Sequence, residues 1–321
     1  MNVARAHALP HFFLRRSLIL ATVLATTFAS LRGADAFDQW TWRGLEPKES
    51  FKGNNYQGAA FAKDQVVIVG SGFKILARKE SDPAWRIYDA GTQRPVYGVA
   101  TAHDTFFAVG ARGTILSSKT AETWTARNSP VAVALAAITY TDSVFVAVGD
   151  GGTILTSRVG SQWLLQPSRV LESLHGATYR DETFIVVGAN GTILASKDGS
   201  YWLPQTAGTK RSLYSVTVSP TGKKIFVAVG EEGTILTSPD GKAWTAQNSG
   251  TTKTLYGIDY GQGTFVAVGA AGTILTSPDG VTWKSRTSGV THFLKAVTFA
   301  RNTCWVVGLN GAILESGAFG K

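Results

Sequence analysis

The chain repeats itself at a nearly constant interval. The segment FVAVGEEGTILTSPDGKAWTAQNSG, residues 226–250, returns 39 residues later as FVAVGAAGTILTSPDGVTWKSRTSG, residues 265–289. Successive copies start 39 to 42 residues apart, and self-similarity at such a period is typical of solenoids and propellers. The block Gly-x-x-Gly-Thr-Ile-Leu begins at Gly110, Gly149, Gly188, Gly230 and Gly269, with variants at Gly70 and Gly308.

Each repeat has the pattern of four strands. In one copy these are LYGIDY (residues 255–260), TFVAVG, GTILTS and WKSRTS. β-Branched and aromatic residues dominate these runs, and Gly, Pro, Asp and Asn separate them. Helical repeats are disfavoured, because no unit has a ten-residue stretch with a 3.6-residue apolar spacing. Seven copies therefore predict an all-β protein, a single seven-bladed β-propeller of four-stranded blades over residues 37–321.

The two ends of the repeat array are complementary. The seventh unit stops at AILESGAFGK without a tryptophan strand, whereas residues 37–44, FDQWTWRG, precede the first unit. The run Trp40-Thr41-Trp42-Arg43 matches Trp283-Lys284-Ser285-Arg286. We therefore expect the N-terminal strand to complete the last blade and to close the ring, which removes the exposed sheet edges.

Turn residues and tryptophans recur at fixed places in the repeat. The run Ser277-Pro278-Asp279-Gly280 suits a tight turn, and the paired glycines Gly269 and Gly272 allow a sharp reversal between the second and third strands. A large aromatic side chain in each unit is expected to wedge between adjacent sheets. These tryptophans are Trp85, Trp124, Trp163, Trp202, Trp244 and Trp283.

The first 36 residues have the features of a secretory signal. Arg5, Arg15 and Arg16 precede an apolar run over residues 18–29, and Ala34-Asp35-Ala36 has the small residues of a cleavage site. The run is about a dozen residues, short of the roughly 20 that a membrane helix needs. We expect residues 1–36 to be removed, leaving an exported protein without a stable membrane span, periplasmic or extracellular. General secretion and twin-arginine export both remain open.

Composition excludes several functional classes. The leader holds four of the 31 Lys and Arg and one of the 22 Asp and Glu, so the remainder has 27 basic and 21 acidic residues, a net charge of about +6. This balance is too weak for a nucleic-acid binder. The single cysteine, Cys304, excludes an internal disulfide and is expected in a buried apolar position, because it occupies the place of Phe265. The histidines after the leader lie in different repeats, so neither a metal nor another cofactor is expected.

The repeat resembles known families. The run Ser-x-Asp-Gly-x-x-Trp, at residues 196–202, 238–244 and 277–283, resembles the Asp-box of bacterial neuraminidase-type (BNR) repeats. The whole unit resembles the photosystem II stability and assembly factor family of seven-bladed propellers. This resemblance implies an exported assembly factor, in the thylakoid lumen if the source is photosynthetic. Because Asp198, Asp240 and Asp279 recur once per blade, we expect them to be structural rather than catalytic.

Candidate binding residues gather on one face of the predicted propeller. The loop that leads into each inner strand, here called the leading loop, shares this face with the turn between strands two and three. Acidic residues on the face are Glu46, Glu49, Asp150, Glu172, Glu231 and Glu232. Basic residues there are Lys48, Lys52, Arg94, Arg112, Arg169, Lys210, Arg211 and Lys253. Beside them on the inner strands lie Tyr97, His175, Tyr214 and Tyr256, with Gln57, Ala136 and Lys295 at the same place in other repeats.

Two classes of function remain open. The first is a monomeric, non-enzymatic propeller that holds a protein partner with an acidic segment. Aromatic and basic side chains around one mouth are typical of interfaces, and a glycan is a further ligand to consider. The second is a secreted carbohydrate-active hydrolase or lyase of the BNR propeller type, which two carboxylates about 5 to 9.5 Å apart in the channel would indicate. Binding is favoured because no acid/base pair or nucleophile stands out. The expected partner-binding residues are Arg94, Arg112, Arg169, Lys210, Arg211, Lys253, Tyr97, His175, Tyr214 and Tyr256.

Overall fold

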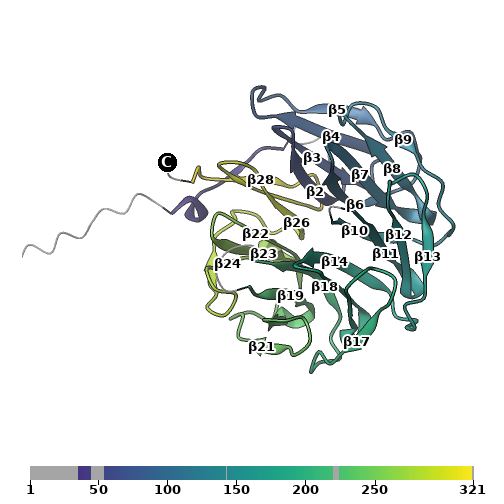
Figure 1. The fold of residues 1–321 in the computed structure, drawn as a ribbon. Helices are drawn as coiled ribbons and strands as arrows, with labels where there is room; N and C mark the ends of the chain where they lie inside the picture. Colours follow the sequence, from purple (N-terminus) through teal and green to yellow (C-terminus); the bar gives the residue numbers. More distant parts are fainter. Residues whose placement is uncertain (1–34, 45–53, 142, 220–223, 320–321) are drawn as a thin grey trace, which may run out of the picture. The chain divides into compact units, whose positions relative to one another are not determined.

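A computed structural model describes residues 35–44, 54–141, 143–219 and 224–319. In these residues the strands form seven antiparallel sheets of four strands each. The inner strands of successive sheets lie side by side, and the last, β26, lies against the first, β2 (Figure 1). The chain is therefore a closed seven-bladed β-propeller, as the repeats predict.

The strands follow one another in the order of the repeats. Blades 1 to 4 contain β2 (Tyr56–Ala62), β3 (Gln65–Gly70), β4 (Lys74–Lys79) and β5 (Arg86–Asp89); β6 (Val96–Ala102), β7 (Thr105–Gly110), β8 (Ile115–Ser118) and β9 (Thr125–Ala126); β10 (Leu135–Tyr140), β11 (Phe145–Gly149), β12 (Thr153–Ser157) and β13 (Leu164–Gln166); and β14 (Leu174–Arg180), β15 (Thr183–Gly188), β16 (Ile193–Ser196) and β17 (Leu203–Gln205). Blades 5 to 7 contain β18 (Leu213–Val218), β19 (Phe226–Gly230), β20 (Ile235–Ser238) and β21 (Thr245–Gln247); β22 (Leu255–Gly261), β23 (Thr264–Gly269), β24 (Ile274–Ser277) and β25 (Lys284–Arg286); and β26 (Leu294–Phe299), β27 (Cys304–Gly308), β28 (Ile313–Ser316) and β1 (Trp40–Trp42).

Short 3₁₀ turns accompany the strands. They are η1 (Ala36–Asp38), η3 (Ala111–Gly113), η4 (Asp150–Gly152), η5 (Ala189–Gly191), η6 (Glu231–Gly233) and η7 (Ala270–Gly272). All except η1 join the second and third strands of a blade. None of the helices in the described residues is long and apolar enough to cross a membrane.

The N-terminal strand β1 completes blade 7. It pairs antiparallel with β28, with Trp40 opposite Ser316 and Trp42 opposite Leu314. The indole N–H of Trp40 donates to the carbonyl oxygen of Phe37 at 2.9 Å, three residues earlier. The indole of Trp283 makes the same contact with Gly280 at 3.0 Å. The predicted match between the two ends of the array is therefore confirmed.

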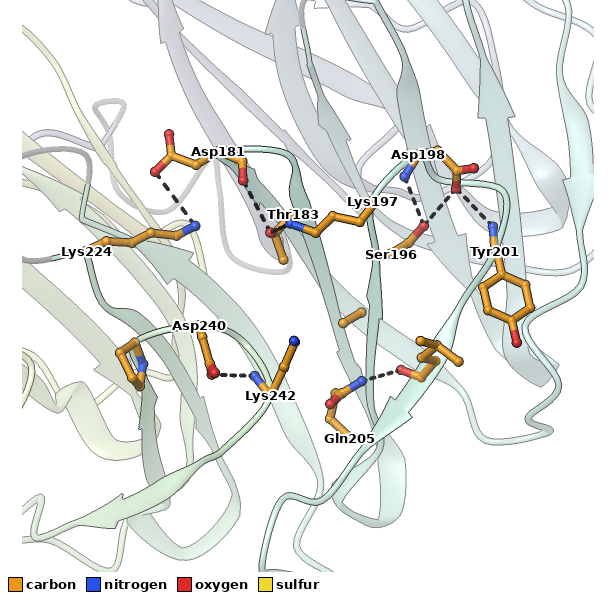
Figure 2. A pocket seen from close by; sticks show the side chains of 13 residues that line it. Asp181, Thr183, Ser196, Lys197, Asp198, Tyr201, Gln205, Lys224, Asp240 and Lys242 are labelled. Carbon is orange, nitrogen blue, oxygen red and sulfur yellow. Dashed lines mark hydrogen bonds and ion pairs between the residues drawn. The ribbon is translucent and has the colours of Figure 1, made fainter.

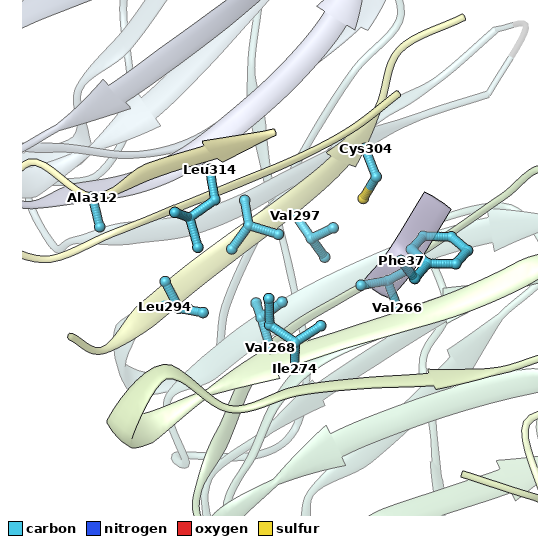
Figure 3. Packing of buried hydrophobic residues seen from close by; sticks show 10 residues of the cluster. Phe37, Val266, Val268, Ile274, Leu294, Val297, Cys304, Ala312 and Leu314 are labelled. Carbon is cyan, nitrogen blue, oxygen red and sulfur yellow. The ribbon is translucent and has the colours of Figure 1, made fainter. Parts of the chain in front are cut away.

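The turn η1 fastens β1 to blades 6 and 7. Phe37 is 5% exposed and belongs to a core cluster built from both blades, which Figure 3 shows together with Cys304. Arg286 of β25, whose side chain is 7% exposed, pairs with Asp35 at 2.7 Å and also with Asp38. Arg43 pairs with Glu315 of β28 at 2.7 Å. Apolar burial and paired charges thus both hold the closing strand.

Each hydrophobic core lies between two neighbouring blades. Every cluster of buried residues combines side chains from two successive sheets, and the recurring tryptophan packs into or against it. The predicted wedge is therefore confirmed, although the burial of the ring varies. Trp202 is 1% exposed and Trp163 is buried, whereas Trp244 and Trp283 are only partly buried. Trp85 differs in its partner, because its indole donates to the carbonyl of Arg43 at 2.8 Å.

The two glycines of the turn between strands two and three serve different purposes. Gly272 has a φ of +69°, and an added Cβ would lie 1.9 Å from the carbonyl oxygen of Val290 in the next leading loop. Gly269 has an extended φ of −164°, but a Cβ there would lie 2.2 Å from the carbonyl oxygen of Thr254. The reversal therefore depends on Gly272 and on Ala271, which has a φ of +53°. Gly269 is needed because the backbone of the leading loop lies so close.

The recurring aspartates stabilise turns. Asp279 Oδ1 accepts hydrogen bonds from the backbone amides of Val281 and Thr282, both at 2.8 Å. Backbone amides of Ser200 and Tyr201 bond in the same way to Asp198 and lower its pKa. The aspartates of blades 4 to 6 thus hold the turn between the third and fourth strands, at the end of the blade opposite the η turns.

A buried carboxyl group and the single thiol lie at the junction of blades 6 and 7. Cys304 is fully buried, as expected, and burial raises the pKa of its thiol, with a further contribution from Asp259. Burial also raises the pKa of Asp259 on β22 to about 6, although backbone amides of Tyr260 and Phe299 bond to the carboxylate and oppose the shift. Phe299 is on β26, so this carboxyl group links the two blades.

Removal of residues 37–44 tests the closure. A chain that starts at residue 45 loses β1, exposes the edge of β28 and, relative to a chain that starts at Phe37, removes Asp38 from Arg286. We expect a loss of roughly 3–9 kcal/mol, because two or three large side chains lose burial worth roughly 1.5–3 kcal/mol each. Thermal unfolding compared with a chain that starts at Phe37 measures the effect, and equal melting temperatures would contradict the closure.

Tryptophan truncation tests the packing between blades. Trp202→Ala removes a fully buried ring and should cost roughly 3–5 kcal/mol, through lost burial and a residual cavity. Trp283→Ala should cost clearly less, because that ring is only partly buried. Urea denaturation of both variants gives the two free energies of unfolding, and an equal or reversed order would show that burial does not decide the cost.

The carboxyl group of Asp259 predicts a specific pH dependence. Its folded pKa of about 6 exceeds the unfolded value of about 3.9, so the folded state holds this proton more tightly. The stability that it contributes is complete below about pH 4 and is lost as the pH rises to 6. We expect Asp259→Asn to remove a fall of roughly 2–3 kcal/mol across this window. Unfolding free energies of both proteins from pH 4 to 7 provide the test, and parallel curves would contradict it.

Candidate functional site

A β-bulge in every inner strand turns one side chain into the central channel. The pairing between the first two strands of each blade shifts register after its first residue pair. Bulges of this kind re-aim a side chain. The skipped residues all line one cavity of about 180 Å³ at the channel mouth, and they are Gln57, Tyr97, Ala136, His175, Tyr214, Tyr256 and Lys295.

Four of the blades contribute a continuous series of rings, here called the aromatic arc, which consists of His175, Tyr214, Tyr256 and Phe293. His175 stacks on Tyr214 with ring centres 5.2 Å apart and an interplanar angle of 22°. Tyr214 lies 5.3 Å from Tyr256, which lies 6.0 Å from Phe293. The predicted aromatic residues of blades 4 to 6 thus meet, whereas Tyr97 lines the channel from blade 2. Phe293 was missed, although an exposed aromatic directly before an inner strand is a signal for it.

Hydrogen bonds fix the orientation of the arc. The Tyr214 hydroxyl donates to Glu231 Oε1 at 3.1 Å, and the Ser212 amide donates to Glu231 Oε2 at 2.9 Å. The bond from Ser212 and the bond from Tyr214 lower the pKa of Glu231, while burial and the nearby carboxylate raise the pKa of Tyr214 to about 12. His175 Nδ1 lies 3.0 Å from the carbonyl oxygen of Leu213 and donates to it. The rings of His175 and Tyr214 are therefore held in place before any ligand arrives.

Lys295 is the cation of the channel wall. Its ammonium nitrogen lies 3.4 Å from the centre of the Tyr256 ring, within the range of a cation–π contact. Burial lowers the pKa of Lys295. No ion pair to this ammonium is found among the described residues, and the residues that line the cavity include no carboxylate.

The predicted cations of the rim have different surroundings. Arg211 pairs with Glu232 at 2.5 Å, and the Arg94 guanidinium donates to the carbonyl of Arg112 at 3.3 Å. The Arg169 guanidinium lies over the ring of Tyr201, which precedes β17 in blade 4, at 5.0 Å from the ring centre. The structure therefore does not bring all of the predicted cations into one sector. Lys210 and Lys253 are exposed on adjacent leading loops, and within the described ranges neither makes an ion pair.

Four of the charged residues predicted for this face lie outside the part of the chain that the structure describes. Lys48, Lys52, Glu46 and Glu49 fall within residues 45–53, outside the described ranges. Among the described acids, Asp150 is exposed on η4, and Glu172 accepts a hydrogen bond from the amide of Leu171 at 3.2 Å. The net charge of the mouth is therefore set by exposed side chains from several blades, among which Lys210 and Lys253 are a basic pair on adjacent leading loops.

A second cavity, here called the outer cavity, lies between blades 4 and 5 and is not revealed by the repeat pattern (Figure 2). It has a volume of about 480 Å³ and lies at the Asp-box turns, away from the mouth. Its acidic groups already have partners: Asp198 and Asp240 hold their own turns, and Asp181 pairs with Lys224 at 3.7 Å. Lys197 donates to Thr183 at 3.0 Å. The outer cavity is thus larger than the channel mouth but has few polar groups free for a ligand.

Chemistry that depends on paired carboxylates or on a metal has little support in this arrangement. The described residues that line the channel provide no pair of carboxylates for glycosidic cleavage. Across the described ranges, no group of three or more His, Cys, Asp or Glu side chains lies close enough to hold a metal ion. The chemistry that the mouth offers is aromatic stacking, hydrogen bonding and attraction of anions.

Comparisons with known proteins find structures of similar fold, without a match in sequence. No family model matches the sequence, and no curated protein matches it. YCF48 from Cyanidioschyzon merolae aligns with a TM-score of 0.68 at 15% identity, over 87% of this chain and 98% of that chain. A structure of YCF48 bound to D1 peptide aligns at 0.69 with 14% identity, over 87% and 95%. Virginiamycin B lyase from Staphylococcus aureus aligns at 0.76 with 13% identity, over 88% and 100%.

At these identities the likeness concerns architecture. The resemblance to photosystem II assembly-factor propellers, inferred from the repeats, is confirmed at the level of the seven-bladed fold that this chain shares with YCF48. A lyase shares the same general architecture, so the fold does not decide between binding and catalysis. Function must therefore be inferred from the residues of the site itself.

Proposed function

We propose that this chain is a non-enzymatic binding propeller that holds a protein partner on its channel mouth. The observation that carries the proposal is the aromatic arc, whose rings are oriented by Glu231 and the surrounding backbone. Tyrosine is enriched in the energetically important centres of protein interfaces, because it presents a large contact area with few torsions to restrict. The arc is such a centre, surrounded by the polar leading loops.

The exposed lysines indicate the charge of the partner. Lys210 and Lys253 lie on the leading loops of blades 5 and 6, directly before the strands that carry Tyr214 and Tyr256. Their ammonium groups are available to a partner, unlike the guanidinium of Arg211. An acidic polypeptide segment therefore complements this sector. The structure of YCF48 bound to D1 peptide supports the proposal, because it shows that a propeller of similar fold binds a peptide.

The location of the partner follows from the leader. If residues 1–36 direct export and are removed, the propeller acts in the periplasm or outside the cell, or in the thylakoid lumen of a photosynthetic source. We propose that it works there as a monomer. A glycan ligand also fits an aromatic surface, but it gives no role to the lysines of the rim. The hydrolase alternative is disfavoured by the absence of a carboxylate pair among the described residues that line the channel.

Charge reversal on the rim tests this proposal. In the variant Lys210→Glu/Lys253→Glu, partner capture should slow by about tenfold or more at low salt, because long-range attraction accelerates association. The difference should shrink at high ionic strength, where the charges are screened. The measurement is the association rate, at several salt concentrations, of the partner that wild-type protein retains from its native envelope.

The matched control is Lys119→Glu/Lys242→Glu, which makes the same charge change on exposed turns at the opposite end of the blades. This control should leave the association rate within about twofold of wild type. Equal slowing by both double variants would mean that only net charge matters. Equal rates for wild type and the rim variant, both shown to be folded, would place the binding surface elsewhere.

A further inference from the structure

The channel mouth changes from polar to apolar with depth. Below the seven bulge residues, the same cavity is lined by Ala59, Val99, Ile138, Ala177, Ile258 and Val297. A ligand that enters therefore meets hydrogen-bonding and charged groups first and aliphatic side chains below them. This arrangement suits a small amphipathic molecule, or the end of a larger one, with one polar and one apolar end.

Lys295 and the neighbouring Gln57 determine which polar group a ligand can place at the mouth. Blade 7 adjoins blade 1 in the ring, so Lys295 and Gln57 occupy adjacent bulge positions. The ammonium contacts a ring face but has no carboxylate partner among the described residues, and the amide of Gln57 provides further N–H donors. Burial lowers the pKa of Lys295, and an anion beside it would restore the balance in favour of the charged form.

The charge of the lining side chains and the volume of the cavity further limit the chemical class of the ligand. Glu231 does not line the cavity and is engaged by Tyr214 and Ser212, so a cationic ligand would find no counter-charge there. A doubly charged phosphate group would meet only one ammonium. The cavity of about 180 Å³ has room for a single ring or side chain, and Ala136, the smallest bulge residue, leaves space opposite Lys295. A monocarboxylate fits these limits best.

We propose that the channel mouth binds a carboxylate attached to a small apolar group. The carboxylate pairs with Lys295 and accepts hydrogen bonds from Gln57, while the apolar group contacts the aliphatic floor and the rings of Tyr214 and Tyr256. The carboxylate belongs either to a free acid or to the C-terminus of a polypeptide. The inference deepens the proposed function because it concerns the same mouth, but it depends on the channel rather than on the rim.

Titration of the intact propeller with phenylacetate tests the proposal. Calorimetry should show saturable binding to wild type, and phenylacetamide, which has the same shape without the charge, should bind at least about tenfold more weakly. Lys295→Met, which keeps the length of the side chain but removes the ammonium, should weaken phenylacetate binding by about tenfold or more, as expected for loss of a hydrogen bond to a charged group. Lys119→Met, on an exposed turn at the opposite end of the blades, is the matched control and should leave the affinity unchanged.

A second variant shows whether lost binding in Lys295→Met results from misfolding. Ala136→Phe fills the cavity and keeps Lys295, so it should also reduce binding while the melting temperature stays close to that of wild type. The two sources of carboxylate are separated by an apolar tripeptide with a free C-terminus and by its C-terminal amide. Preference for the free tripeptide over phenylacetate assigns the site to a polypeptide end, and the reverse assigns it to a free acid.

Three results would overturn the inference: no saturable binding of either carboxylate to wild type, equal binding of phenylacetate and phenylacetamide, or unchanged affinity in Lys295→Met. The rim variant Lys210→Glu/Lys253→Glu separates this failure from failure of the proposed function. If it binds phenylacetate normally and also captures the partner normally, the partner surface is wrong and the channel site stands. If phenylacetate fails while rim reversal still slows capture, the channel site alone is wrong.

Discussion

The structure depends on the packing of each blade against the next. A four-stranded sheet of this size cannot bury its two faces alone, and every hydrophobic cluster in the described residues is shared by successive blades. Such an array is stable only when its first and last members also have neighbours. The chain meets this requirement by placing β1, from its N-terminal side, beside β28. Arg286 and Phe37 then tie the closing strand to blades 6 and 7.

The same packing gives the mouth its functional character. Glycines such as Gly272 bring each η turn against the next leading loop, and the bulge at the start of each inner strand recurs in all seven blades. This framework is nearly invariant, whereas the side chain at the bulge changes from blade to blade. The repeat therefore fixes the position of each channel side chain, and the differences between repeats determine which chemical groups line the mouth. Aromatic rings occupy blades 4 to 6, and Lys295 follows in blade 7.

The sequence predicts much of the fold and of the channel mouth, because equivalent positions can be compared between repeats. Alignment of the repeats is enough to find the four strands, the tryptophan wedge, the role of Trp40 and the seven channel positions. It cannot predict which side chains pair, since Arg211 and Glu232 belong to different parts of the repeat and meet only in the folded blade. For the same reason it misplaces Arg169, whose guanidinium reaches Tyr201, which precedes β17 in blade 4. The outer cavity is invisible to alignment because it forms between blades.

The central claim is that the scaffold is uniform and that binding occurs where the repeats differ, at the channel mouth. Hydrogen–deuterium exchange of the propeller, with and without the partner recovered from its native envelope, tests this most directly. We expect added protection in the leading loops of blades 4 to 7 and in the η turns of blades 4 to 6, with unchanged exchange at the Asp-box turns. Protection confined to the Asp-box turns and the outer strands would contradict it.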